Sequence, residues 1–240
     1  MQDIKRTIES LKKEILRNDY LYYILSQPKI SDKEYDNLLF KLKKLEDEHQ
    51  EFKSDDSVTM RVSGGIQEGF PAVRHKEKML SLENTYSFDE LKDWDSRVRK
   101  GLGAGGRIEY VVELKIDGVS ANLTYKNGKL ISGATRGDGE TGEDVTGNIR
   151  SIRAVPLRLL GNGLPELIEI RGEVYMDRVD FAKLNKEREI EGEDAFANPR
   201  NAASGSLKLL DHGITYKRRL NFFAHSLGAV GGAKILSLRL

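Results

Sequence analysis

Three charged side chains, Glu113, Lys115 and Asp117, stand at alternate positions within residues 107–118. In an extended strand, alternate residues point to the same face and lie roughly 7 Å apart, so these three can line one small-molecule site. The intervening residues are mainly apolar, which predicts a strand with a core face and a charged face. Lys115 is then a candidate nucleophile.

A lysine nucleophile must first lose its proton. In water near pH 7.4 only about one lysine amine in a thousand is unprotonated, so desolvation or a cationic or metal neighbour has to assist. Glu113 and Asp117 oppose this unless a metal or ligand occupies them. A solvated charged face is an equally ordinary explanation of the alternation, and the remaining sequence must decide.

The composition narrows the class of protein. The chain has 240 residues, 38% hydrophobic and 32% charged, which allows one large domain or a medium domain with a small companion. No apolar run is long enough to span a membrane and no signal-peptide core is present. We therefore expect a soluble cytoplasmic protein without membrane contacts.

Several kinds of chemistry are excluded or disfavoured. The chain has no cysteine, which excludes disulfides, thiolate catalysis and cysteine-based zinc sites. Its four histidines have no metal-ligand spacing. A net charge of +1 excludes global attraction to polyanions but leaves room for a local basic patch.

The first fifty residues predict two helices. Apolar residues recur at helical spacing between Ile4 and Ile15. Ser31, followed three residues later by Glu34, is a capping box that begins a second helix. This part of the chain is interpreted as a small helical domain.

The second helix carries a cluster of polar residues. Asp32, Tyr35 and Asp36 stand at i, i+3 and i+4, so they lie on one side of it. They are either favourable negative charge in a first helical turn or part of a binding site. Tyr22 and Tyr23, just upstream, supply aromatic partners that favour a site.

The middle of the chain predicts a loop and then a helix. Residues 51–78 lose periodicity and indicate a linker or a long loop. A helix begins at Ser87, with Leu91, Trp94 and Val98 on its inward face, and residues 101–106 end it.

The second half predicts an antiparallel sheet. Val119–Lys126 and Lys129–Thr135 flank Asn-Gly, a strong hairpin signal. Residues 136–144 indicate a charged, glycine-rich loop outside the core. Further elements are a strand at 167–176 that alternates apolar and charged residues, a helix at 177–188, a turn into small residues at 196–208, and a strand at 219–228. The small residues of 196–208 either offer amides to a phosphate at a helix start or form a tight packing turn.

Four motifs together resemble the NAD-dependent DNA ligases of bacteria. Residues 115–118 resemble the K-x-D-G motif of nucleotidyltransferases, which is weak by itself. Glu113 and the T-R-G-D-G-x-x-G-E-D-V-T run at 135–146 match the same family. So do R-G-E-V at 171–174 and F-A-N-P-R-N-A-A at 196–203. Their order along nearly the whole chain makes the resemblance specific.

The resemblance implies a role for each residue of the adenylation site. Lys115 attacks the adenylyl phosphorus of NAD, forming lysyl-AMP and releasing nicotinamide mononucleotide. Asp117 orients the lysine or supports Mg²⁺, which prefers carboxylate and phosphate oxygens. Contacts to the adenosine half are implied for Glu113 (adenine), Arg136 and Glu173 (ribose and phosphate), and Ser81 and Leu82 (pocket wall).

The resemblance also assigns the nicotinamide half of NAD to the N-terminal helices. The implied contacts are Tyr22, Tyr23, Asp32, Tyr35 and Asp36. Tyr23 departs from the family pattern, where a histidine is usual. Tyrosine can stack and donate a hydrogen bond, but it lacks the imidazole charge.

Basic residues are implied to contact nicked double-stranded DNA. Arg200 matches a family position, and Lys208 keeps the charge of the next one without the forked geometry of arginine. With Lys217, Arg218 and Arg219 they can form a basic surface toward DNA phosphates, or a solvated basic face.

The resemblance implies an α+β fold with two domains. Residues 1–60 are expected to form a helical module that binds nicotinamide mononucleotide, and residues 61–240 a nucleotidyltransferase domain of antiparallel sheets flanked by helices. Family members continue with further motifs and domains, so we expect a truncated, monomeric chain that binds NAD, adenylylates itself slowly or not at all, and does not seal nicks. The alternatives are a non-catalytic nucleotide- or DNA-binding fragment and an ATP-dependent lysyl-nucleotidyltransferase.

Overall fold

The computed structural model of the chain describes residues 2–21, 27, 29–54, 56–61, 69–103 and 107–232. The chain divides into two compact units. The sheet unit comprises Met1–Lys78 and Ile116–Leu240, and the α3 unit comprises Met79–Lys115. Each unit is considered by itself.

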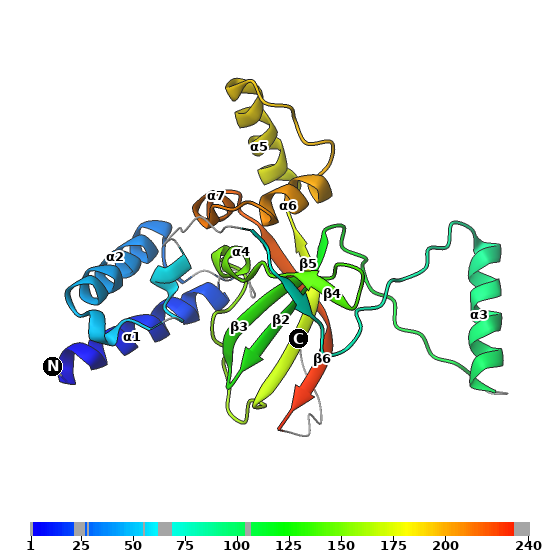
Figure 1. Cartoon of the computed structure of the whole chain (residues 1–240), viewed down its shortest axis with the longest axis horizontal. Helices are drawn as coiled ribbons and strands as arrows, with labels where there is room; N and C mark the ends of the chain where they lie inside the picture. Colours follow the sequence, from blue (N-terminus) through cyan, green and yellow to red (C-terminus); the bar gives the residue numbers. More distant parts are fainter. Residues whose placement is uncertain are drawn as a thin grey trace. The chain divides into compact units, whose positions relative to one another are not determined.

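The helices α1 to α7 and the strands β2 to β6 are labelled in Figure 1. The helices are α1 (Gln2–Asp19), α2 (Asp32–Glu48), the short 3-10 helices η2 (Gln50–Phe52) and η3 (Val58–Arg61), α3 (Phe88–Leu102), α4 (Thr146–Ser151), α5 (Arg178–Glu191), α6 (Pro199–Leu207) and α7 (His212–Lys217). The strands are β1 (Ala72–Arg74), β2 (Val119–Lys126), β3 (Lys129–Thr135), β4 (Thr141–Glu143), β5 (Leu167–Tyr175) and β6 (Asn221–Gly231).

The strands form two antiparallel sheets. Four strands pair in the order β3-β2-β5-β6, and β1 pairs with β4. The turn between β2 and β3 places Asn127 and Gly128 at φ angles of 49° and 75°, the left-handed values that a tight hairpin turn requires. The predicted hairpin, the strand at β5 and the α+β fold class are confirmed.

The register of β2 against β5 gives the large sheet two different faces. Leu123 opposes Ile170 on the apolar face, whereas Ser120 opposes Glu173 on the other. Because side chains alternate along a strand, the charged residues of β5 share this polar face with the polar residues of β2. The alternation predicted for β5 is therefore confirmed.

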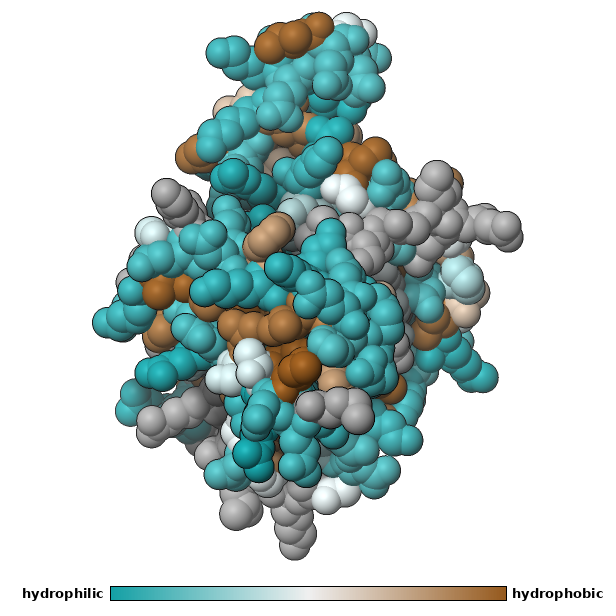
Figure 2. All heavy atoms as spheres, turned by 90° about the vertical axis from the view of Figure 1, so that its left-hand side faces the viewer, coloured by the Kyte–Doolittle hydropathy of each residue, from teal (hydrophilic) through white to brown (hydrophobic). Residues whose placement is uncertain are grey.

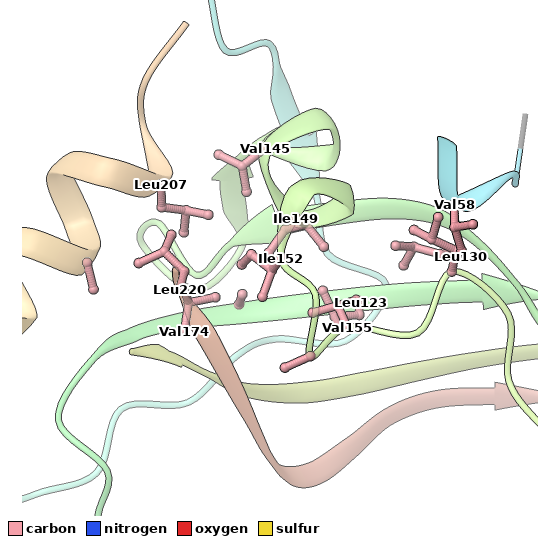
Figure 3. Close-up of a cluster of buried hydrophobic side chains, with 14 of the residues drawn as sticks. Val58, Leu123, Leu130, Val145, Ile149, Ile152, Val155, Val174, Leu207 and Leu220 are labelled. Carbon is pink, nitrogen blue, oxygen red and sulfur yellow. The ribbon is translucent and has the colours of Figure 1, made fainter. Parts of the chain in front are cut away.

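Helix α4 packs on the apolar face of the sheet (Figure 3). A Cβ atom at Gly133 of β3 would lie 2.7 Å from the side chain of Ile149, so the glycine lets the helix approach closely. Leu123 and Ile149 are among the fully buried side chains, and burial of each such side chain contributes about 1.5–3 kcal/mol. Helix α4 and the six-residue α7 were not predicted, because one or two turns are too short to show a period.

The N-terminal helices are joined by a buried ion pair. Lys12 of α1 lies 3.1 Å from Glu46 of α2, and the hydroxyl of Thr59 in η3 donates a short hydrogen bond to Glu46. The capping box of Ser31 and Glu34 at the start of α2 is present as predicted.

The segment after α2 is more ordered than the predicted linker. Within residues 51–78 the structure contains part of η2, all of η3 and strand β1. Val58 is only 3% exposed and lies near Leu130 (Figure 3), while Asp56 forms ion pairs with Lys129 and Arg158 at 3.6 and 3.3 Å. The prediction of a linker or a long loop missed these short elements, because buried contacts made by single residues leave no periodic signal.

The strand predicted for residues 107–118 does not form. No described residue pairs with the backbone of 107–117, and Val112 and Leu114 are 93% and 83% exposed. A strand needs a hydrogen-bonded neighbour as well as an apolar alternation. Helix α3 begins after Ser87 as predicted, but its expected inward residues Leu91 and Trp94 are 46% and 37% exposed.

The remaining predictions are largely confirmed. Helix α5 and strand β6 lie where the pattern indicated, and residues 136–144 form a loop that also contains β4. Within the described residues every helix is too short or too polar to cross a membrane. The face in Figure 2 is predominantly hydrophilic, with apolar side chains gathered in small groups.

Candidate functional site

The glycine of the K-x-D-G motif lies directly against β5. Gly118 is buried, and a Cβ atom there would lie 2.2 Å from the carbonyl oxygen of Val174. Only a residue without a side chain permits this approach. The chain therefore passes from the motif onto the sheet one register position from Glu173.

Asp117 and Arg200 are brought together. The Nη1 atom of Arg200, in the first turn of α6, lies 3.4 Å from Oδ1 of Asp117. Asn198 caps this helix by accepting a hydrogen bond from the amide of Asn201, and Pro199 occupies the first turn. Both charged side chains are exposed, so the pair is open to solvent and to a ligand.

The polar face of the sheet has unpaired buried atoms. Glu173 accepts a hydrogen bond from Ser120 at 3.1 Å through Oε1, while its Oε2 is buried without a hydrogen-bond partner among the described residues. The same holds for Oδ1 of Asn122 and Nε of Arg171 on the facing positions. Buried polar atoms normally have partners, so this face has hydrogen-bonding capacity for water or a ligand.

Arg171 fastens the segment that enters the α3 unit. Its guanidinium donates to the carbonyl oxygens of Glu77 and Lys78 at 2.7 and 3.2 Å. Gly118 packs beside Val174 of the same strand. Strand β5 therefore contacts both segments of the sheet unit that lead into the α3 unit, the one ending at Lys78 and the one beginning at Ile116. The sequence placed Arg171 on the charged face of its strand but gave no signal for these backbone contacts.

Arg136 lies at the start of a loop that is held by hydrogen bonds. Its amide donates to the Ser120 carbonyl at 3.0 Å, and its carbonyl lies 3.1 Å from Nε2 of the buried His75. Gly137 has a φ of 57°, which the turn requires. Backbone N–H groups of Thr141 and then Glu140 lower the pKa of Asp138 by stabilising its carboxylate. His75 had no sequence signal.

Four predicted site residues belong to the α3 unit and are exposed: Ser81, Leu82, Glu113 and Lys115. Within this unit the Trp94 and Tyr110 rings lie 5.3 Å apart, and the Tyr110 hydroxyl donates to Asp95 at 2.5 Å. These contacts tie α3 to the segment leading to Lys115.

The N-terminal site residues are only partly described. Tyr22 and Tyr23 lie outside the described residues, and Asp32 begins α2 but its side chain is likewise outside them. The Tyr35 hydroxyl donates to Asp19 at 2.6 Å, and Asp36 is exposed.

Tyr35 and Asp36 line a cavity of about 640 Å³ within the sheet unit. Its other lining residues come from the end of α1, the segment before α2, the end of α4, the start of α5, and α7 with the start of β6: Asn18, Lys29, Ile30, Ser151, Arg153, Asp177, Asp180, Tyr216, Lys217, Arg219, Leu220 and Asn221. A cavity of this volume is in the range that holds a small-molecule ligand.

The predicted basic surface is partly neutralised. Lys208 forms a close ion pair with Glu143, and Arg219 lies 3.9 Å from Asp180. With Arg200 held near Asp117, three of the five predicted cations have carboxylate neighbours in the sheet unit.

The donor set for magnesium is sparse. Among the described residues no group of three or more His, Asp or Glu side chains could hold a metal ion. Mg²⁺ is commonly bound by one or two carboxylates together with substrate phosphates. The exposed Asp117 fits such a site, in which the ion supplies charge neutralisation at the phosphates.

These features define an α+β protein in which a helical module accompanies an antiparallel-sheet domain of the adenylation type. The family model for the NAD-dependent DNA ligase adenylation domain matches residues 67–237. The model for the DNA ligase-like, N-terminal NAD+-binding domain matches residues 1–63. The chain therefore belongs to the NAD-dependent DNA ligase family, as the sequence motifs indicated, which sets aside an ATP-dependent enzyme.

Similar proteins called DNA ligase span almost the whole chain. The relative from Desulforudis audaxviator is 49% identical over 96% of this chain and 34% of its own length. Those from Marinobacter nauticus and Thermodesulfovibrio yellowstonii are 49% and 48% identical over 94% and 98% of this chain. The chain thus spans about a third of the length of the curated relatives it matches.

Proposed function

We propose that the chain provides the NAD recognition and lysine adenylylation of a NAD-dependent DNA ligase. The unprotonated Nζ of Lys115 attacks the adenylyl phosphorus of NAD. The N–P bond forms as the P–O bond to nicotinamide mononucleotide breaks. The attacking nitrogen then loses one proton to water, which leaves the neutral phosphoramidate nitrogen. The products are lysyl-AMP and nicotinamide mononucleotide.

The approach of Gly118 to β5 carries this proposal. Lys115 precedes Gly118 by three residues, and Glu173 opposes Ser120 two residues beyond it. The two motifs assigned to the adenylyl group are thus joined at one edge of the polar face, where Oε2 of Glu173 is unpaired. A ribose hydroxyl is a suitable donor for that atom.

The other assigned residues extend the proposal. Glu113 reads adenine, Ser81 and Leu82 form a pocket wall, and Arg136 contacts the ribose and phosphate region. Asp117 orients the lysine or supports magnesium at the phosphates. Such a site works by positioning and charge neutralisation, which suits a chain without cysteine.

We assign the nicotinamide half of NAD to residues 1–60, with 61–240 as the nucleotidyltransferase domain. The presence of Tyr35 and Asp36 in one cavity supports this assignment. Tyr22, Tyr23 and Asp32 are proposed to complete the site. In the whole enzyme, acting in the cytoplasm, Arg200 and Lys208 contact the phosphates of nicked DNA.

Calorimetry and intact-mass measurement test this function. With NAD and Mg²⁺, the 240-residue chain should bind NAD and acquire an AMP adduct, and Lys115→Ala should abolish the adduct. Glu173→Ala should weaken NAD binding about tenfold, because a buried carboxylate acceptor is lost. Lys186→Ala, an exposed change on α5, is the matched control.

Absence of NAD binding would refute the proposal. An AMP adduct that persists in Lys115→Ala would refute the assignment of Lys115 as the nucleophile.

A non-catalytic nucleotide-binding role is the second candidate. It is favoured by the α3 unit, in which no described residue from Leu80 to Lys115 is buried. Lys115 itself is exposed and belongs to this unit. Binding of NAD with no adduct after prolonged incubation would support this role.

A further inference from the structure

The cavity that contains Tyr35 and Asp36 has walls from two parts of the sheet unit. Asp36 belongs to α2, whereas Lys217 ends α7 and Arg219 precedes β6. Each part contributes charges of both signs, since Lys29 lies with Asp36 on the first, and Asp177 and Asp180 lie with the basic residues on the second.

Most charged groups of the cavity already have partners. Arg153 stacks on the Tyr216 ring, with its guanidinium carbon 4.5 Å from the ring centroid. Asp177 accepts a hydrogen bond from Asn221 at 2.8 Å, and Arg219 lies 3.9 Å from Asp180.

Lys29, Asp36 and Lys217 differ from these groups. All three are exposed, and in the described part of the chain none of their side chains forms a hydrogen bond or an ion pair. An unpaired cation and an unpaired anion thus face the same cavity. A ligand that carries one positive and one negative group would satisfy both.

The backbone beside Lys217 is also unusual. Arg219 adopts a φ of 49°, in the left-handed region that residues other than glycine seldom occupy. Such conformations gather at ligand-binding segments, where the surrounding structure maintains them. Here the conformation accompanies the turn from α7 into β6, and Lys217 and Arg219 at this turn both line the cavity.

We propose that Lys217 binds the phosphate of nicotinamide mononucleotide, the group released when Lys115 is adenylylated. The inference rests on the proposed function, in which Tyr35 and Asp36 hold the nicotinamide end. The positively charged pyridinium ring lies toward Asp36 and the phosphate toward Lys217. The sheet domain thereby contributes a residue to recognition of the leaving group.

Two ligands that differ by the phosphate alone test the proposal. In titration calorimetry, Lys217→Ala should bind nicotinamide mononucleotide about tenfold more weakly than the unmodified chain does, because one charge-assisted contact is lost. Nicotinamide riboside, which lacks the phosphate, should bind both chains equally. Lys217→Arg should retain most of the affinity for the mononucleotide, and Lys186→Ala should leave the affinity for both ligands unchanged.

The outcomes separate the inference from the function on which it rests. Unchanged affinity of Lys217→Ala for the mononucleotide, or an equal loss for the riboside, overturns the role of Lys217 and leaves the proposed function intact. Weaker binding of nicked DNA with unchanged mononucleotide binding assigns Lys217 to DNA instead and overturns the inference. If the unmodified chain binds neither nicotinamide ligand, both the inference and the nicotinamide assignment fail.

Discussion

Similar alternating sequence patterns are buried in the sheet unit and exposed in the α3 unit. In β2 the alternating apolar residues are buried, and Leu123 is 1% exposed. In residues 107–117 a comparable alternation leaves Val112 93% exposed. The difference lies in the partner, since β2 has hydrogen-bonded strands on both sides. An alternating pattern states which face can be buried, and a neighbouring strand decides whether it is.

Glycine substitutions should give the largest contrast between the two units. Gly118→Ala places a Cβ atom 2.2 Å from the Val174 carbonyl, which forces β2 and β5 apart and should cost about 3 kcal/mol of unfolding free energy. Gly101→Ala in α3 meets no atom within 4 Å and should raise local helix stability by up to about 1 kcal/mol.

Urea unfolding with two probes can resolve these effects. The single tryptophan, Trp94, lies in the α3 unit, so its fluorescence reports that unit, while far-ultraviolet circular dichroism reports both. Gly118→Ala should lower the main dichroism midpoint. An unchanged midpoint for Gly118→Ala would mean that the strands do not approach as closely as described.

Arginine substitutions should give a smaller contrast. Arg171→Met removes hydrogen bonds to the carbonyls of Glu77 and Lys78 and should cost about 1–2 kcal/mol. Arg97→Met in the α3 unit removes only an exposed ion pair with Glu83 at 4.0 Å and should change stability by less than about 0.5 kcal/mol.

Native-state trypsin digestion adds a local measurement. Arg171→Met should accelerate cleavage after Lys76 or Lys78, because the segment is no longer held against β5, and Arg97→Met should not. Equal cleavage rates in Arg171→Met and the unmodified chain would show that the two carbonyl contacts do not hold this segment.

The sequence predicted those elements whose signals are local. The Asn127-Gly128 turn, the capping box at Ser31 and the alternation of β5 each arise within a few residues, and each is confirmed. The anchoring contacts of Arg171 and Asp56 join segments far apart in the chain. No local pattern specifies such contacts, so only the folded structure reveals them.

In the candidate site, too, the sequence indicated single residues and the structure adds their contacts. Glu173 and Asp117 were found through motifs, and the structure adds their neighbours Ser120 and Arg200. Residues 107–118 were singled out by their alternation, and the strand inferred from it was wrong, while the site assigned to them stays a prediction. A motif allows a prediction of chemistry that does not depend on its secondary structure, because the side-chain types are the same whether or not a partner strand is present.

Carboxylates in the two units give the smallest predicted contrast, which depends on pH. Burial alone raises the pKa of Asp56, but a hydrogen bond from Ser54 and the charges of Lys129 and Arg158 outweigh it and lower the pKa below its usual value. A lowered pKa in the folded chain stabilises it above about pH 4, the ordinary range of an aspartate, and this stabilisation is lost as the pH falls through the folded value.

Asp56→Asn should therefore lower the unfolding free energy by about 1 kcal/mol at pH 7, with the difference from the unmodified chain shrinking below about pH 4.

In the α3 unit, a hydrogen bond from Arg99 and then one from Tyr110 lower the pKa of Asp95. Asp95→Asn should follow the same pH trend with a smaller effect that added salt suppresses, because these groups are exposed. Urea titrations at pH 7 and pH 3 measure both. A larger loss for Asp95→Asn than for Asp56→Asn at pH 7, or a loss for Asp56→Asn that grows on acidification, would contradict the assignment of Asp56 as an anchor of the sheet unit.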